Sequence, residues 1–154
     1  MTSRGFTLVE MAVVMVVVAL LAAVATPSLV EVLVNQRLRA AGSDLVSSLY
    51  LARSEAIKRN ANVTVQPATG AGWVEGWVVL ADDGAQLDRK TPAGNRVAVT
   101  RAPGTIVFTP SGRIDPLGRA RVEFSDAAGH PGISSRCVTV ETTGLPRLEA
   151  RPCA

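Results

Sequence analysis

An apolar segment near the amino terminus carries a single acidic residue, and this combination constrains the chain more than any other feature. The segment runs from Phe6 to Ala25, and Glu10 is its one charged side chain. As a helix it would rise about 30 Å, which matches the hydrocarbon core of a bilayer. A carboxylate inside such a helix costs roughly 2.5 to 3.5 kcal/mol, so it is expected only where a partner charge or a task requires it. The segment is therefore predicted to serve in assembly as well as in anchoring.

Two other interpretations of this segment stay open. A cleaved secretory signal would use Arg4 as its basic start, Met11 to Leu21 as its apolar centre and Ala23-Val24-Ala25 as a small-x-small cleavage site. Against it stand the cost of Glu10 in a disposable segment and the helical pattern that continues beyond Ala25. A plain single-pass anchor would explain neither Glu10 nor the residues before it.

The rest of the chain is long enough for one modest domain. The 154 residues carry a formal net charge of +3, which permits nucleic acid or anionic lipid as a partner without requiring either. Both cysteines, Cys137 and Cys153, lie far beyond the apolar segment. Such a pair in an exported domain is more simply a disulfide than a metal site, and it implies an oxidising compartment. The link would close a loop of about 16 residues and stabilise the fold by roughly 3 kcal/mol.

A helical pattern continues past the apolar segment. Pro27 removes a backbone donor and is expected to kink the helix locally. Asn60 is expected to end the helix, because it tolerates a left-handed conformation and follows the cationic Lys58 and Arg59. Between these points, small and apolar residues recur at three- and four-residue steps on one face, which is predicted to pack on the globular domain: Leu38, Ala41, Leu45, Leu49, Ala52 and Ala56.

The residues after Asn62 read as short strands separated by Gly, Pro and Asp. The predicted strands are 63–66, 76–81, 96–100, 105–109, 119–124, 137–142 and 147–150. A long helix followed by a run of strands indicates an α+β fold with an antiparallel sheet against the apolar face of the helix. Trp73 and Trp77 are expected to fill the gap between helix and sheet.

Few residues in the sequence fit the pattern of a catalytic or metal-binding site. His130 is the one histidine, and it lies in the turn-prone stretch Gly129-His130-Pro131 with nothing nearby to orient it. The acidic residues Asp82, Asp83 and Asp88 do not follow the spacing of a calcium loop. No phosphate-cradling glycine loop is present. The sequence therefore predicts no enzyme, no cofactor and no metal.

The stretch Arg4-Gly5-Phe6-Thr7-Leu8-Val9-Glu10, followed by an apolar helix interrupted at Pro27, resembles the class III signal of type IV pilins and type II secretion pseudopilins. The resemblance implies cleavage after Gly5 by a prepilin peptidase, methylation of the new amino terminus on Phe6, and retention of the helix. Glu10 would then pair with the Phe6 amino group in the same or a neighbouring subunit, because opposite charges attract strongly in a medium of low dielectric constant.

The same resemblance implies a division of the chain. Residues 1–5 would be the leader peptide, 6–27 the transmembrane and assembly helix, 28–60 the amphipathic helix and 61–154 the β-rich head. The protein would cross the inner membrane once, with its head in the periplasm, and would join other pilins through the helix. Arg4 on the amino-terminal side agrees with a cytoplasmic start.

Later residues resemble the GspH/FimT group of minor pilins and pseudopilins. These are the stretch Leu51 to Asn60, the residues Trp73 and Gly76-Trp77, and the predicted strand that begins at Cys137. The implied function is a minor pilin in the initiating or tip complex of a type IV pilus. A minor pseudopilin of a type II secretion system is the alternative, and Pro27 together with residues 52–56 favours the pilus.

Some FimT-type minor pilins bind DNA through a Gly-Arg-x-Arg motif near the carboxyl end, which makes DNA uptake a third hypothesis. At the expected place this chain reads Gly144-Leu145-Pro146-Arg147, so only Arg147 matches. A literal copy, Gly118-Arg119-Ala120-Arg121, occurs earlier, and strand alternation would put Arg119 and Arg121 on one face. Further candidates for nonspecific phosphate contact, which would weaken with salt, are Arg113, Arg136 and Arg151.

Overall fold

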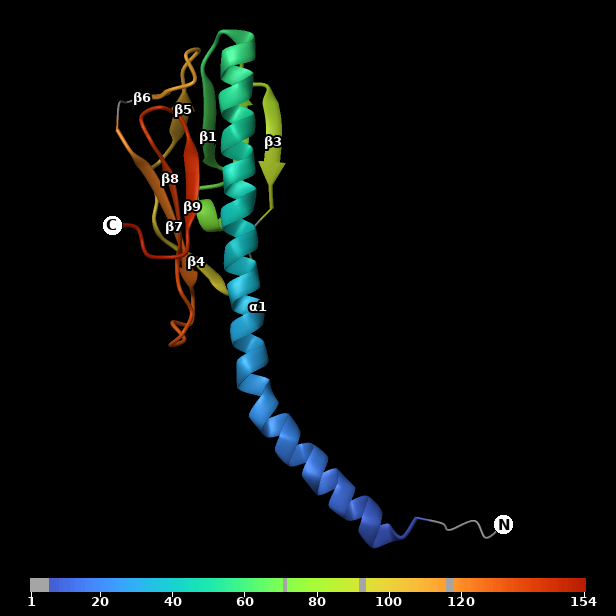
Figure 1. Ribbon diagram of the computed structural model, residues 1–154. Helices are drawn as coiled ribbons and strands as arrows, with labels where there is room; N and C mark the ends of the chain where they lie inside the picture. Colours follow the sequence, from blue (N-terminus) through green and yellow to red (C-terminus); the bar gives the residue numbers. More distant parts are fainter. Residues whose placement is uncertain (1–5, 71, 92–93, 116–117) are drawn as a thin grey trace. The chain divides into compact units, whose positions relative to one another are not determined.

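One long helix is followed by nine strands in the computed structural model, which describes residues 6–70, 72–91, 94–115 and 118–154 (Figure 1). The side chains of residues 23–28 are not described, and Gly5 and the rest of the predicted leader lie outside the described residues. The chain divides into a unit of residues 1–33 and a head unit of residues 34–154, and each is considered by itself.

Helix α1 spans Leu8–Arg59. Thr7 caps its start, because the Thr7 hydroxyl oxygen accepts a hydrogen bond from the Glu10 backbone N–H at 3.2 Å. Thr7 and Glu10 have the spacing of a capping box, which the sequence analysis did not notice. Among the described residues, no helix is long and apolar enough to span a membrane. The predicted span 6–27 includes residues 23–27, whose side chains lie outside the description, so it stays a prediction.

The end of α1 confirms the prediction for Asn60. The Asn60 N–H donates to the Ile57 carbonyl and the Ala61 N–H donates to the Ala56 carbonyl, which together form a Schellman motif. Asn60 has φ of 50°, and among the described residues it is the one non-glycine residue with positive φ. The helix therefore ends through a local signal that can be read from the sequence.

The strands of the head form two antiparallel sheets. The first has the order β3-β2-β1-β5-β6 and the second the order β4-β7-β8-β9. The bounds in the first sheet are β1 Val63–Pro67, β2 Trp77–Ala81, β3 Gln86–Lys90, β5 Ile106–Phe108 and β6 Ile114–Asp115; a 3-10 turn, η1, covers Trp73–Glu75. The bounds in the second sheet are β4 Val97–Arg101, β7 Ala120–Asp126, β8 Arg136–Val140 and β9 Pro146–Glu149.

The head portion of α1 packs against both sheets. All six residues of the predicted apolar face are buried, and Val34 extends that face by one turn. Ser48 on the helix donates a 3.1 Å hydrogen bond to Asp88 of β3, and Gly42 lies against Leu148 of β9. The α+β prediction is confirmed, with two sheets in place of the expected one.

The tryptophans are buried, as predicted, but they connect different elements from those expected. The Trp73 and Trp77 ring centroids are 6.5 Å apart, and Trp77 lies 6.3 Å from Phe124 in the other sheet. Trp73 in η1 also donates a 2.6 Å hydrogen bond from its indole nitrogen to the Pro103 carbonyl. The aromatic cluster therefore fills space between the two sheets.

Two strands were not predicted. Strand β3 reads Gln-Leu-Asp-Arg-Lys, a polar edge strand without the apolar alternation that marks a half-buried strand. Strand β6 has only two residues. Both strands owe their conformation to pairing with a neighbour, which a local sequence pattern does not report.

Asn60→Ala is expected to lower the free energy of unfolding of the head by about 1 kcal/mol, because a Cβ-bearing residue without a capping side chain pays the full cost of left-handed φ. Asn60→Gly should be neutral or slightly stabilising. Denaturant unfolding of both variants measures this, with the exposed Asn62→Ala as control. Equal losses at positions 60 and 62 would contradict the assignment.

Candidate functional site

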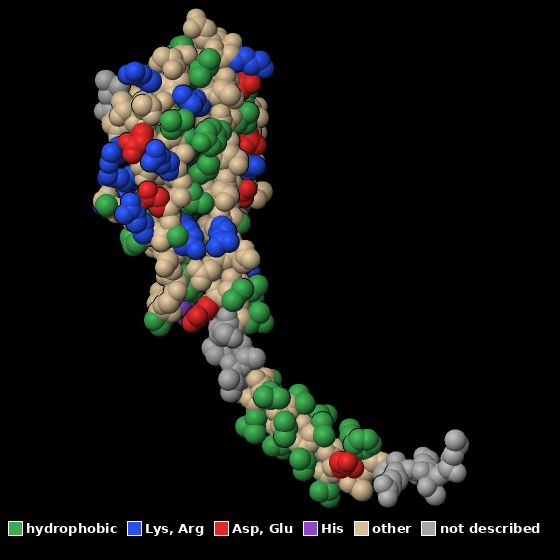
Figure 2. All heavy atoms as spheres, viewed as in Figure 1, with side chains coloured by type: hydrophobic (Ala, Val, Ile, Leu, Met, Phe, Trp, Pro, Cys, Tyr) green, Lys and Arg blue, Asp and Glu red, His purple; other side chains and the backbone are tan. Residues whose placement is uncertain are grey.

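The amino-terminal processing and assembly residues lie at the start of α1. Phe6 is 72% exposed and precedes the helix, and Glu10 is exposed in its first turn. Every Leu, Val and Met between residues 8 and 21 is 45% to 85% exposed, and these residues cover all sides of the helix. Figure 2 shows hydrophobic side chains along this segment. The kink expected at Pro27 concerns a side chain outside the described residues.

Four of the six arginines predicted as phosphate contacts, Arg119, Arg121, Arg147 and Arg151, line one cavity at the second sheet. Strand β7 pairs with β8 so that Arg121 lies opposite Thr139, and β8 pairs with β9 so that Thr139 lies opposite Arg147. The neighbouring row, Val122, Val138 and Leu148, points the other way, with both valines fully buried. Alternation therefore turns Arg121, Thr139 and Arg147 to the outer face.

The two arginine-containing segments lie in register on either side of β8. Ala120 of Gly118-Arg119-Ala120-Arg121 is opposite Val140, and Val140 is opposite Pro146 of Gly144-Leu145-Pro146-Arg147. Arg119 forms a 2.8 Å ion pair with Glu141, and the Glu141 N–H donates to the Leu145 carbonyl. Arg119, Glu141 and Leu145 therefore lie side by side across the three segments. In this row the first segment has a guanidinium group where the second segment has leucine.

These side chains enclose a cavity of about 140 Å³. Four arginine and two glutamate side chains line it, and these side chains carry an excess of two positive charges. In Figure 2, basic and acidic side chains are interspersed on the side of the head where β7 and β8 lie. The residues that line the cavity are Arg119, Arg121, Cys137, Thr139, Glu141, Arg147, Glu149, Arg151 and Ala154.

Two of the four arginines are held by the glutamates. Glu141 accepts a hydrogen bond from Arg119, and Glu149 accepts one from Arg151 at 2.7 Å. The Arg151 hydrogen bond, with the charges of Arg151 and Arg147, lowers the pKa of Glu149, and the same hydrogen bond raises the pKa of Arg151. Within the described residues, the Arg121 and Arg147 side chains form no hydrogen bond or ion pair, so neither guanidinium group is held by a carboxylate as those of Arg119 and Arg151 are.

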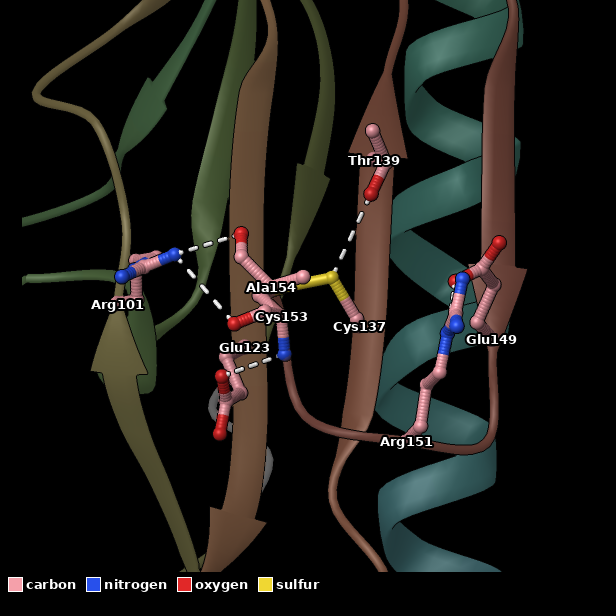
Figure 3. The surroundings of a disulfide bond; sticks show 8 residues. All are labelled: Arg101, Glu123, Cys137, Thr139, Glu149, Arg151, Cys153 and Ala154. Atoms are coloured by element: carbon pink, nitrogen blue, oxygen red, sulfur yellow. Dashed lines mark hydrogen bonds and ion pairs between the residues drawn. A yellow bond between two sulfur atoms is a disulfide. The ribbon is translucent and has the colours of Figure 1, made fainter.

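A disulfide fixes one wall of the cavity, and the disulfide prediction is confirmed. It joins Cys137 on β8 to Cys153 in the carboxyl-terminal segment (Figure 3). The Cys153 N–H donates to Glu123 of β7 at 2.8 Å. Arg101 of β4 donates to the Cys153 and Ala154 carbonyl oxygens at 3.4 and 3.1 Å. The segment thus crosses the face of the sheet from β9 toward β4 and covers Cys137.

Gly144 is required by packing. It has φ of 77°, and a Cβ at this position would overlap the Gly112 carbonyl oxygen. That oxygen also accepts a 3.0 Å hydrogen bond from Arg53 of α1. The turn between β8 and β9 therefore sits against the turn between β5 and β6 and against the helix, which places Arg147 at the beginning of β9.

Other residues that the sequence pointed to do not line this cavity. Arg136 is 8% exposed and donates to the Ser134 and Ser135 carbonyls, so its prediction as a phosphate contact was wrong. Arg113 does not line the cavity. The expectation that nothing nearby orients His130 was wrong, because its ring Nδ1 lies 2.6 Å from Asp126, four residues earlier. The hydrogen bond from the His130 backbone N–H lowers the pKa of Asp126. Among the described residues, no group of three or more potential ligands gathers that would hold a metal ion.

Three polar side chains of the cavity were not predicted from the sequence. Thr139, Glu141 and Glu149 become visible only when β8 is placed between β7 and β9. The signal that was available is the alternation in β8, where Cys137 and Thr139 fall on the face opposite to Val138 and Val140.

Gly144→Ala is expected to lower the free energy of unfolding by roughly 2 to 4 kcal/mol, because left-handed strain adds to the overlap with Gly112. Gly84→Ala is the matched control: its φ is 81° and a Cβ there meets nothing within 4 Å, so it should cost only about 1 kcal/mol. Urea unfolding of the two variants compares them. Equal losses would show that the contact between the two turns is unimportant.

Two models of known protein families match the chain. The family described as type II transport protein GspH matches residues 41–144, and the prokaryotic N-terminal methylation motif matches residues 1–26. A comparison with curated proteins gave no significant match.

Solved structures show the same fold. The type IV minor pilin FimU of Pseudomonas aeruginosa superposes with a TM-score of 0.59 at 21% identity, over 72% of this chain and 91% of that one. The minor pseudopilin EpsH from the type 2 secretion system of Vibrio cholerae superposes with a TM-score of 0.57 at 16% identity, over 74% of this chain and 97% of that one. At these identities the likeness establishes the fold.

Proposed function

We propose that this chain, which belongs to the GspH family of type II transport proteins and carries the N-terminal methylation motif, is a minor pilin of a type IV pilus. Its role is structural: it joins the initiating or tip complex through α1 and presents its β-rich head outside the membrane. Residues 1–5 are the leader, 6–27 the transmembrane and assembly segment, 28–60 the amphipathic part of the helix and 61–154 the head.

The observation that carries the proposal is the exposed apolar surface at the start of α1. A helix that is hydrophobic on every side needs a covering of lipid or protein. Within the described residues, the side chains from Leu8 to Leu21 are not covered by the chain itself. A bilayer before assembly, and the helices of neighbouring subunits afterwards, supply that cover. Glu10 is the one charge among them, and its proposed partner is the amino group of Phe6.

The choice of a pilus over a secretion system rests on Pro27 and on the sequence Ala52-Arg53-Ser54-Glu55-Ala56. The matched family is described as a type II transport protein, whereas the solved structures come from both machines. Deleting the gene in the source bacterium separates them: loss of surface pili with normal protein secretion supports the proposal. Normal piliation with impaired secretion would assign the chain to the pseudopilus.

Mass spectrometry of the mature protein tests the processing. The expected amino terminus is a methylated Phe6, produced by a prepilin peptidase on the cytoplasmic side of the inner membrane. A mature chain that begins at Thr26 would instead mean an ordinary secretory signal, and the assembly role of α1 would be lost with it.

Glu10→Gln is expected to leave membrane insertion intact, because it removes a charge that is costly in a bilayer. It should nevertheless reduce incorporation into filaments about tenfold or more, since the Phe6 amino group loses its partner. Glu10→Asp keeps the negative charge and should retain part of the incorporation into filaments. Immunoblots of sheared filaments and of membranes measure both steps. Normal incorporation of Glu10→Gln would contradict the pairing.

DNA capture for natural transformation is a second candidate function. The observation that favours it is the convergence of Arg119, Arg121, Arg147 and Arg151 on one cavity, although the candidates come from two distant segments of the sequence. Guanidinium groups bind phosphate oxygens with two parallel hydrogen bonds, so such a face suits the backbone of a nucleic acid. Its contacts would be independent of base sequence and would weaken with salt.

A further inference from the structure

We propose that the cavity on the outer face of β7, β8 and β9 binds a single phosphate group between Arg121 and Arg147, with the Thr139 hydroxyl as a third donor. Arg119 and Arg151 shape the cavity and do not bind the ligand directly. The inference relies on the DNA-capture candidate only for the identity of the macromolecule that carries the phosphate.

The spacing of the strands places the two arginines correctly for one shared ligand. Arg121 and Arg147 lie in the same row with Thr139 between them. Adjacent strands are about 4.8 Å apart, so the two arginine backbones are separated by roughly 10 Å. Two extended arginine side chains on the same face can both reach one phosphate group across this distance. A cavity of about 140 Å³ accepts a phosphate group, whose volume is roughly that of two to three waters.

The ion pairs divide the arginines into two classes. Arg119 and Arg151 each donate to a glutamate, at 2.8 and 2.7 Å, and a phosphate would have to compete with that carboxylate. The side chains of Arg121 and Arg147 form no hydrogen bond or ion pair in the part of the chain that the structure describes. Binding of an anion by these two breaks no ion pair, but the charge of Arg147 also acts on Glu149, whose pKa it lowers.

Thr139 provides the remaining donor. Its hydroxyl oxygen lies 3.4 Å from the Cys137 sulfur. A disulfide sulfur has no proton, so Thr139 is the donor in this contact, and sulfur is a weak acceptor. A phosphate oxygen would take this hydrogen bond readily. The disulfide thus holds the threonine hydroxyl on the floor of the cavity.

The number of phosphate contacts can be measured through salt. For single-stranded nucleic acid, the logarithm of the binding constant falls with the logarithm of the salt concentration with a slope of about −0.7 per neutralised phosphate charge. One phosphate shared by the two arginines predicts a slope of about −0.7, whereas four arginines that each neutralise a separate phosphate would give about −2.8. Arg121→Gln and Arg147→Gln should each weaken binding about tenfold at low salt, because each removes one of the two guanidinium groups that share the phosphate.

The experiment uses the full-length chain in a non-ionic detergent and the fluorescence anisotropy of a short labelled oligothymidylate. Arg89→Gln is the control, because it removes one positive charge from an exposed position on β3, in the other sheet. This control should bind within about twofold of the parent, in contrast to the tenfold losses above.

A second readout keeps this inference separate from DNA capture. Inorganic phosphate is titrated while the arginine Nε–Hε signals are followed by NMR, and those of Arg121 and Arg147 should shift while that of Arg89 does not. If phosphate shifts these signals but the oligonucleotide does not bind, the phosphate site stands and DNA capture fails. If Arg89→Gln weakens oligonucleotide binding as much as Arg121→Gln, DNA contact stands and the proposed site is overturned. Absence of both responses overturns both.

Discussion

The buried stripe on α1 between Val34 and Ala56 is the contact from which the rest of the head is built. Its side chains are almost wholly removed from water, and they face both sheets at once. Ser48 connects the helix to β3, and Gly42 lets it approach Leu148 on β9. Because these two strands are the edges of different sheets, the helix fixes how the sheets are placed with respect to one another. The position of β9, and therefore of Arg147, follows from helix packing.

Sequence patterns predicted those features that depend on local chemistry. The apolar steps of α1, the left-handed stop at Asn60 and most strands were found because each has a periodic or turn signal within a few residues. Strands β3 and β6 were missed because their conformation comes from pairing. The division into two sheets was also missed, because no local pattern tells which strands pair. The aromatic contact between Trp77 and Phe124 likewise depends on that division.

For the cavity too, the features that depend on one strand were predicted, and the features that depend on pairing between strands were not. Alternation within a strand correctly predicted that Arg119 and Arg121 share a face, and both line the cavity with Arg147. The sequence alone did not predict the register of the strands. In that register β8 lies between Gly118-Arg119-Ala120-Arg121 and Gly144-Leu145-Pro146-Arg147. The glutamates that hold two of the arginines come from that register too. Arg136 was wrongly included because its position in β8 gave no indication that its side chain would be buried.

The path of the carboxyl-terminal segment affects how the protein can be labelled. Ala154 lines the cavity, and Arg101 holds its carbonyl oxygen, so a reporter fused after this residue would disturb the wall next to the arginines. The turn at Asp82-Asp83-Gly84 is exposed and belongs to the first sheet, where a Cβ on Gly84 meets nothing. An affinity tag or fluorophore inserted at that turn would leave the arginine-lined face of β7, β8 and β9 intact for imaging and for pull-down work.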